Sequence, residues 1–167
     1  VVLLVDTFNN YFEPENARAA LKVLQAAGYR VHLPHAVDGG RPLCCGRTFL
    51  AGGLVDEARH EAQRMIDTLK PYVERGVPVI GLEPSCLYTL KDEFVALLPG
   101  AETEAVAKQA MTFEDYVVAE RKAGRVPDAL FKALPQTRAL VHGHCHQKAF
   151  GAFATVQEAL KLVPGLA

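Results

Sequence analysis

VPVIGLEPSC, residues 77–86, is the stretch that decides which fold to expect of this chain. Its first half is a short apolar run bounded by turn residues, which predicts a buried strand over Pro78–Leu82. Pro84 and Ser85 then form a turn that leads into the start of a helix. A buried strand followed at once by a helix is the repeating unit of parallel sheets.

Similar apolar runs recur along the chain and alternate with longer segments of helical periodicity. The other expected strands are Val1–Asp6, Arg30–Pro34 and Ala139–Gly143. The expected helices are Pro14–Ala27, Ala51–Tyr72, Leu87–Leu97, Thr112–Ala123 and one after the last strand. This alternation predicts an α/β fold, a Rossmann-like open parallel sheet of about four strands with helices on both faces.

The composition indicates one globular domain and argues against nucleic acid as a partner. The chain has 167 residues, of which 50% are apolar, enough for a core of ordinary size. Its 18 basic and 19 acidic residues give a net charge of -1, whereas non-specific nucleic-acid binding needs a basic excess. No apolar run approaches the roughly 20 residues of a membrane span. A cytoplasmic protein without direct membrane insertion is therefore expected.

All four cysteines of the chain follow expected strands. The segments DTFNNYF, LCCGR, EPSC and HCHQK lie at or beyond the carboxyl ends of the four predicted strands, in that order. Because ligands of open parallel sheets collect at the carboxyl ends of the strands, these segments are expected to meet at one edge. The candidate ligands delivered there are the thiols of Cys44, Cys45, Cys86 and Cys145.

Cys44 and Cys45 are adjacent and precede Gly46, a placement in which the two thiols cannot readily form a disulfide with each other. Soft thiolates select iron–sulfur clusters, zinc or copper(I), and glycine lets the backbone approach closely. Cys86 lies at an expected helix start, where the helix dipole favours the thiolate. The alternative is that these cysteines are inert, buried apolar residues.

Cys145 is flanked by His144 and His146. Such a group suits a zinc site, a cluster site or a catalytic pair in which Cys145 or Cys86 is activated by one of the two histidines. The alternative is that these histidines only bond backbone carbonyls in a tight turn.

Polar residues beside the cysteines are the candidate pocket residues. Asp6, Thr7 and Asn10 end the first expected strand, where helix capping would explain Thr and Asn almost as well. Arg47 and Glu83 are candidates by position alone. No glycine-rich phosphate-binding pattern follows any expected strand.

Four segments together resemble a known family: NNYFEPENARAALKVLQAAGYRV, LCCGRTFLAGGLVDEAR, VIGLEPSCLYTLKDEF and LVHGHCHQKAF. They resemble the cysteine-rich CCG domain found in iron–sulfur subunits of glycolate oxidase, lactate-utilisation proteins, anaerobic glycerol phosphate dehydrogenase and heterodisulfide reductase. The likeness is greatest to the C-terminal region of fused proteins that join an FAD-linked oxidase domain, a ferredoxin-like domain and this module.

The family pattern is a cysteine after the first strand, then Cys-Cys-Gly, then Cys-x-x-Cys. By this resemblance Cys44 and Cys45 are the Cys-Cys-Gly pair, and Cys86 is the last cysteine of Cys-x-x-Cys. Thr7 and Glu83 stand where two further cysteines of the pattern would be. The resemblance therefore implies a reduced ligand set.

The pattern usually occurs twice in tandem, and Cys145 matches the cysteine that opens the second copy. The resemblance implies that residues 1–167 are a single module cut from a longer chain, with the second copy truncated within 138–167. A strand-like start at Val1 and a helix-like end fit a piece of this kind.

The function implied by the resemblance is a redox or electron-transfer module of an FAD-dependent 2-hydroxy acid dehydrogenase, acting on glycolate, D-lactate or a similar acid. An iron–sulfur cluster, or zinc in its place, would be held by the four cysteines with His144 or His146. FAD would belong to the flavin oxidase domain, which with the ferredoxin-like domain would be the partner. The chain alone would not be catalytic, and a quinone-linked partner would bring it to the inner membrane. The alternative is a zinc-binding or metal-free docking domain of the same enzyme.

Overall fold

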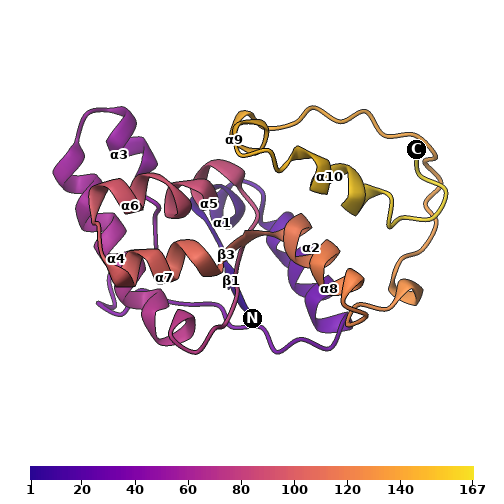
Figure 1. Ribbon diagram of the computed structural model, residues 1–167, viewed down its shortest axis with the longest axis horizontal. Coiled ribbons are helices and arrows are strands. Elements are labelled where there is room, and N and C mark those ends of the chain that lie inside the picture. The colour runs from indigo at the N-terminus through magenta and orange to yellow at the C-terminus, as the bar shows by residue number, and fades with distance from the viewer.

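The computed structural model describes residues 1–167 and is built around a small parallel sheet (Figure 1). The strands are β1 (Val2–Leu4), β2 (Val79–Gly81) and β3 (Ala110–Thr112), and they lie in the order β1-β2-β3. The register pairs Val2 with Val79 and Val79 with Ala110. Two of the predicted strands, at the chain start and within the opening stretch, are therefore present and adjacent.

Helices account for most of the remaining structure. They are α1 (Thr7–Tyr11), α2 (Pro14–Ala26), α3 (Arg47–Ala51), α4 (Val55–Val73), α5 (Pro84–Lys91), α6 (Glu93–Leu97), α7 (Ala101–Gln109), α8 (Phe113–Lys122), α9 (Cys145–Ala149) and α10 (Phe153–Leu160), with a 3-10 turn at Asp128–Leu130. The expected helix at Ala51–Tyr72 starts only at Val55, because Gly53 adopts a left-handed φ of +77° that ends α3 first. None of the helices combines the length and apolar character needed to cross a membrane.

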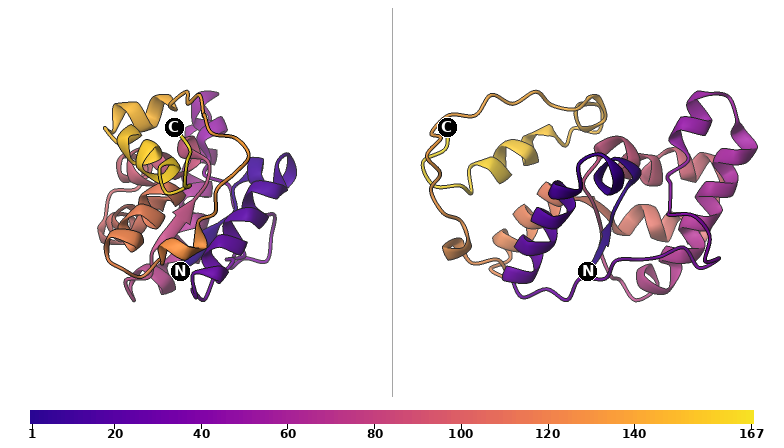
Figure 2. Two further views of the ribbon diagram at one scale, coloured as in Figure 1. Left: turned by 90° about the vertical axis from the view of Figure 1, so that its right-hand side faces the viewer. Right: turned by 180° about the vertical axis from the view of Figure 1, so that it is seen from behind.

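Apolar side chains alternate between the two faces of the sheet, and helices cover both faces as predicted. On one face, Val2, Leu4 and Val79 pack in a core of 16 buried residues that draws on α4, α5 and α7. On the other face, Leu3 and Ile80 pack against α2 and α8. Figure 2 shows these two helical layers from the side and from behind.

The expected strand at Arg30–Pro34 is reduced to one parallel bridge between Val2 and His32. The His32 N–H donates to the Val1 carbonyl and the Leu3 N–H donates to the His32 carbonyl, both at 2.9 Å. Proline has no N–H to donate, so Pro34 cannot continue this pairing. The prediction was therefore right that this segment pairs in parallel within the sheet and wrong about the length of the strand.

The expected strand at Ala139–Gly143 is not a strand. Leu140 is fully exposed, and the segment is held by one backbone bond, from the Ala139 N–H to the Ala167 carbonyl at 2.8 Å. Figures 1 and 2 show this orange-to-yellow part of the chain looping away from the sheet before it returns through α9 and α10. Without a neighbouring strand, an apolar run has nothing to pair with.

The third strand, β3, lies in a segment where no strand was expected. Its Thr112 does not begin the helix predicted over Thr112–Ala123; the Thr112 hydroxyl caps α8 by accepting from the Asp115 N–H at 3.2 Å. The sheet therefore has three strands, not about four, and its third member differs from the predicted one.

Candidate functional site

The carboxyl ends of the three strands each lead into a capped helix. The Asp6 carboxylate accepts from the Phe8 and Asn9 N–H groups, at 2.9 and 3.1 Å, and caps α1. Glu83 caps α5 by accepting from the N–H two residues on, at 3.2 Å, and Thr112 caps α8. Asp6 and Glu83, expected as pocket residues, thus also orient the helices that follow the strands.

Three of the four cysteines meet beside this edge. The Cys44 thiol contacts the Cys45 thiol, and the Cys45 thiol contacts that of Cys86 at the start of α5. The Gly46 N–H donates to Cys44 Sγ at 3.4 Å. Gly46 has a φ of +74°, and a side chain there would approach the Ala58 carbonyl to 3.1 Å. The glycine of the Cys-Cys-Gly motif is therefore required both by its backbone conformation and by the close packing of α4.

Thr7 joins this group of thiols. It begins α1, directly after β1, and its side chain contacts the Cys44 thiol. Thr7 is the residue that stands where the resemblance places a cysteine. The fold therefore brings four positions together, of which three carry thiols and one carries a hydroxyl. We call Thr7, Cys44, Cys45 and Cys86 the thiol group.

The thiols of Cys44 and Cys45 are held in the neutral form. Contact with Cys45, together with burial, raises the pKa of Cys44 above the usual range for a thiol. For Cys45, the contact with Cys44 lowers the pKa, but the contact with Cys86 and burial outweigh it and raise the pKa to about 12. A metal that binds these thiols must therefore displace their protons.

Cys145 differs from the cysteines of the thiol group in its exposure and in its position along the chain. It is the first residue of α9 and is exposed, whereas Cys45 and Cys86 are buried. His144 caps α9, with its Nδ1 accepting from the His146 N–H at 3.2 Å. The HCHQK segment therefore lies at the start of a helix and does not follow a strand as the sequence suggested.

The two histidines lie against α5. His144 Nε2 is 3.9 Å from the Glu83 carboxylate, and its ring stacks on that of His146 at a centroid distance of 5.2 Å. Burial lowers the pKa of His146, and the positive charges of Arg47 and His144 lower it further. The ring of Tyr88 lies 6.3 Å from that of His146. These contacts bring the HCHQK segment next to the start of α5.

The remaining pocket candidates have separate roles. Arg47, the first residue of α3, forms an ion pair with Glu93 on α6 and donates to the Thr89 hydroxyl at 3.5 Å. Asn10 is exposed and lines a different surface cavity, together with His35. Arg47 therefore ties three helices together, and Asn10 does not join the thiol group.

The side chains near the strand ends match a metal site in chemical kind but not in number. No three His, Cys, Asp or Glu side chains in the chain are arranged so that they hold one ion together. In chemical kind, the three soft thiols of the thiol group fit an iron–sulfur cluster or zinc. In number, they are one short of a four-cysteine set.

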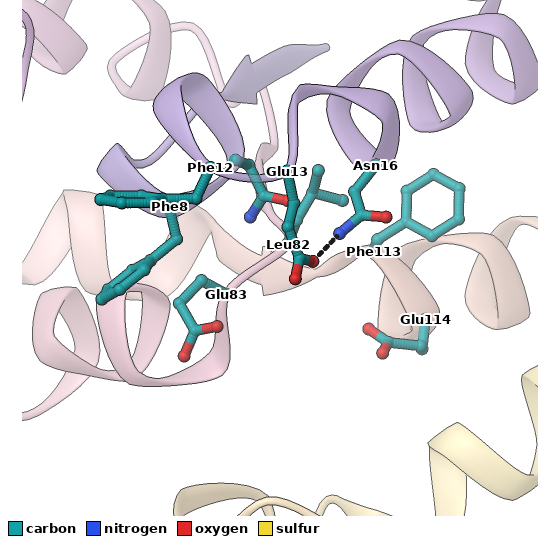
Figure 3. Close-up of a pocket in the computed structure, with 9 residues that line it drawn as sticks. Phe8, Phe12, Glu13, Asn16, Leu82, Glu83, Phe113 and Glu114 are labelled. Atoms are coloured by element: carbon teal, nitrogen blue, oxygen red, sulfur yellow. Dashed lines mark hydrogen bonds between the residues drawn. The ribbon is translucent and has the colours of Figure 1, made fainter.

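A cavity of about 370 Å³ opens beside the strand ends, and the sequence did not predict it (Figure 3). It lies between α1, the start of α2, the end of β2 and the start of α8. Its lining residues are Phe8, Asn9, Phe12, Glu13, Asn16, Leu82, Glu83, Phe113 and Glu114. The available signal was the three aromatic residues of DTFNNYF, which stay exposed on and directly after a five-residue helix; two of them, Phe8 and Phe12, line the cavity.

Comparisons with known proteins point to dehydrogenases. The chain is 27% identical over 160 residues to a subunit of anaerobic glycerol-3-phosphate dehydrogenase from Escherichia coli (strain K12), and the match covers 95% of this chain and 38% of that protein. It is 29% identical over 102 residues to D-2-hydroxyglutarate dehydrogenase of Pseudomonas putida, a match that covers 61% of this chain and 9% of that protein. No family model and no solved structure matches the chain.

The chain thus spans less than two fifths of the length of the curated relatives that it matches. Both relatives are named as dehydrogenases or as parts of one, which supports the predicted association with oxidoreductases. The narrower identification as a CCG domain is not established by a family model.

Proposed function

We propose that this chain is an electron-transfer module of an FAD-dependent dehydrogenase that oxidises a 2-hydroxy acid, with a cysteine-ligated iron–sulfur cluster as its redox group. The observation that carries the proposal is the thiol group, in which residues from three separate segments meet at one edge of the sheet. The names of the two relatives support the link to dehydrogenases.

Cys44, Cys45 and Cys86 would supply three thiolate ligands, and such a cluster supplies one-electron transfer when bound. Gly46 would contribute through its N–H bond to Cys44 Sγ, because hydrogen bonds to ligand sulfur tune reduction potentials. Cys145 is the proposed fourth ligand, with His144 or His146 in that role for zinc.

The partners belong to the same proposal. FAD would be carried by a flavin oxidase domain, and a ferredoxin-like domain would exchange electrons with this module. The module would work in the cytoplasm or at the inner membrane through a quinone-linked partner. Hydride chemistry would remain with the flavin, so the chain alone would not turn over substrate.

A metal-free or zinc-binding docking module is the second candidate. It is favoured by the membership of Cys45 and Cys86 in the larger apolar core, where neutral thiols pack as small apolar groups. In that case the module would close over the oxidase domain without carrying electrons.

The test is anaerobic purification followed by analysis of iron, acid-labile sulfide and zinc, with visible absorption and electron paramagnetic resonance. We expect iron and sulfide in the wild-type protein and their loss in Cys44→Ser, with far-ultraviolet circular dichroism as the check on folding. Stoichiometric zinc without broad visible absorption would support the docking module. A colourless, metal-free protein that cannot be reconstituted, and whose Cys44→Ser form is fully active in the parent enzyme, would overturn the proposal.

Thr7→Cys provides a gain-of-function variant. Because Thr7 contacts Cys44, a thiol there adds a fourth sulfur to the thiol group. We expect several-fold higher cluster occupancy, retained when Cys145→Ser is added. The matched control is Thr137→Cys, at an exposed position in the extended C-terminal part. Equal occupancy in the two threonine variants would argue against ligation at the thiol group.

A further inference from the structure

The cavity in Figure 3 is distinct in chemistry from the thiol group. We propose that it binds an organic cation, an ammonium or guanidinium group carried on a short apolar chain. This inference does not depend on the proposed function, since none of its nine lining residues is a cysteine.

The cavity lies where the topology of the sheet opens a crevice. After β1 the chain passes into α2, whose Ala20 and Leu24 pack on one face of the sheet. After β2 it passes into α5, whose Leu87 and Leu90 pack on the opposite face. Connections that leave two adjacent strands toward opposite faces create the crevice in which ligands of open α/β sheets bind.

The charges in the cavity are all of one sign. Glu13, Glu83 and Glu114 line it, and no lysine, arginine or histidine does. Glu114 is partly buried, and burial raises its pKa more than hydrogen bonds with Thr112 and the backbone lower it; the one charge that acts on it, Asp115, has the same sign. A cation in the cavity would supply the missing charge, whereas a 2-hydroxy acid anion would be repelled.

Aromatic rings select the kind of cation. Phe8 and Phe12 lie on one side with their ring centroids 6.0 Å apart, and Phe113 lies near Asn16 on the other side (Figure 3). Phe8 is 51% exposed and Phe12 is 73% exposed, so much of their apolar surface is uncovered. Phenyl faces attract ammonium and guanidinium groups and also cover apolar chains.

A bare metal ion is a poorer match for the same cavity. The three carboxylates do not converge on one point, because no group of three acidic, histidine or cysteine side chains in the chain is placed to hold an ion. One of them, Glu13, already accepts from Asn16 Nδ2 at 2.8 Å. A volume of about 370 Å³ suits a small organic group.

The test is a nuclear magnetic resonance titration of the 167-residue chain at pH 7.5 with 2-phenylethylamine, against 3-phenylpropionate as a probe of similar shape and opposite charge. We expect saturable shifts at the cavity residues with the amine only. Glu114→Gln should weaken binding about tenfold, and Phe12→Ala about three- to fivefold. Glu15→Gln, an exposed carboxylate on α2 outside the cavity, should change nothing. Glu13→Gln replaces Glu114→Gln if that variant fails to fold.

A second probe identifies the source of the cation. Nα-acetyl-lysine methylamide stands for a lysine side chain of a neighbouring protein, and 2-phenylethylamine stands for a free amine. Tighter binding of one or the other assigns the source, and both results support the proposal. Equal binding of the amine and the carboxylate, no shifts with any cation, or equal effects of Glu114→Gln and Glu15→Gln would overturn it.

Discussion

Two regions of this chain are built differently. Every buried apolar side chain lies between Val2 and Val126, which we call the body. In residues 127–167, the C-terminal segment, Gln147 is the one buried polar side chain and no apolar side chain is fully buried. The body is therefore held by its own core, whereas the segment is positioned by surface contacts of α9 with α5 and of α10 with α8.

The cysteines divide in the same way. Cys44, Cys45 and Cys86 belong to the body and are at least half-buried, whereas Cys145 belongs to the segment and is exposed. A ligand set that includes Cys145 would join a rigidly packed part to a loosely attached one. Packing in the body therefore holds Cys44, Cys45 and Cys86 together, and Cys145 lies outside that packing.

The largest expected effect is the loss of a core side chain in the body. Phe94 is completely buried, and Phe94→Ala should lower the free energy of unfolding by about 3–5 kcal/mol, because it removes apolar burial and leaves a cavity. Phe150→Ala, at a 46% exposed ring of the segment, should cost about 1 kcal/mol or less. Urea unfolding of both variants measures the two changes in the free energy of unfolding. Equal changes would contradict the division into body and segment.

The next effect concerns thiol reactivity. Cys145 is exposed, whereas burial and thiol contacts raise the pKa of Cys44 and of Cys45. In metal-free protein at pH 7.5, iodoacetamide should modify Cys145 about a hundredfold faster than the other two, a rate ratio equivalent to about 2.7 kcal/mol. Peptide mass spectrometry over time identifies the site. Loss of the fast phase in Cys145→Ser is the control, and faster reaction of Cys44 or Cys45 would refute the burial argument.

A smaller effect is expected at alkaline pH. The pKa of Cys45 is raised from 9.0 to about 12 in the folded protein, so its contribution to stability is full below pH 9 and is lost as pH rises toward 12. The free energy of unfolding of the metal-free chain should fall by about 1–2 kcal/mol over this window. Cys45→Ala should flatten the dependence, and Cys145→Ala should not. Identical pH profiles for these two variants would show that the loss of stability at alkaline pH does not come from the Cys45 thiol.

The smallest effect is expected at the ion pair between the two regions. Lys122 on α8 donates to Glu158 on α10 at 2.5 Å, but both side chains are largely exposed. Lys122→Ala should therefore change stability by less than about 0.5 kcal/mol, an effect that salt suppresses further. Thermal unfolding at low and high salt tests this. A loss above about 1 kcal/mol would mean that the segment is attached more firmly than its burial indicates.

Strands were predicted correctly from the sequence where the local residue pattern and the packing of the whole chain favour the same structure. The run over Pro78–Leu82 contains β2, because this apolar stretch has a strand partner on each side and is buried between the helices that cover the sheet. The prediction failed at β3, whose three residues have no strand pattern of their own and become a strand by pairing with β2. It also failed at Ala139–Gly143, where the pattern is present and the partner is missing.

For the site, the sequence by itself determined that Cys44 and Cys45 are adjacent and precede a glycine, and that Cys86 follows a buried strand near the start of a helix. Only the tertiary structure decided that Cys86 meets this pair, that Thr7 occupies the fourth position, and that Cys145 stays exposed on α9. The physical reason is that residue types and their spacing are local. Strand pairing and burial depend on residues distant in the chain, and they decide which side chains come into contact.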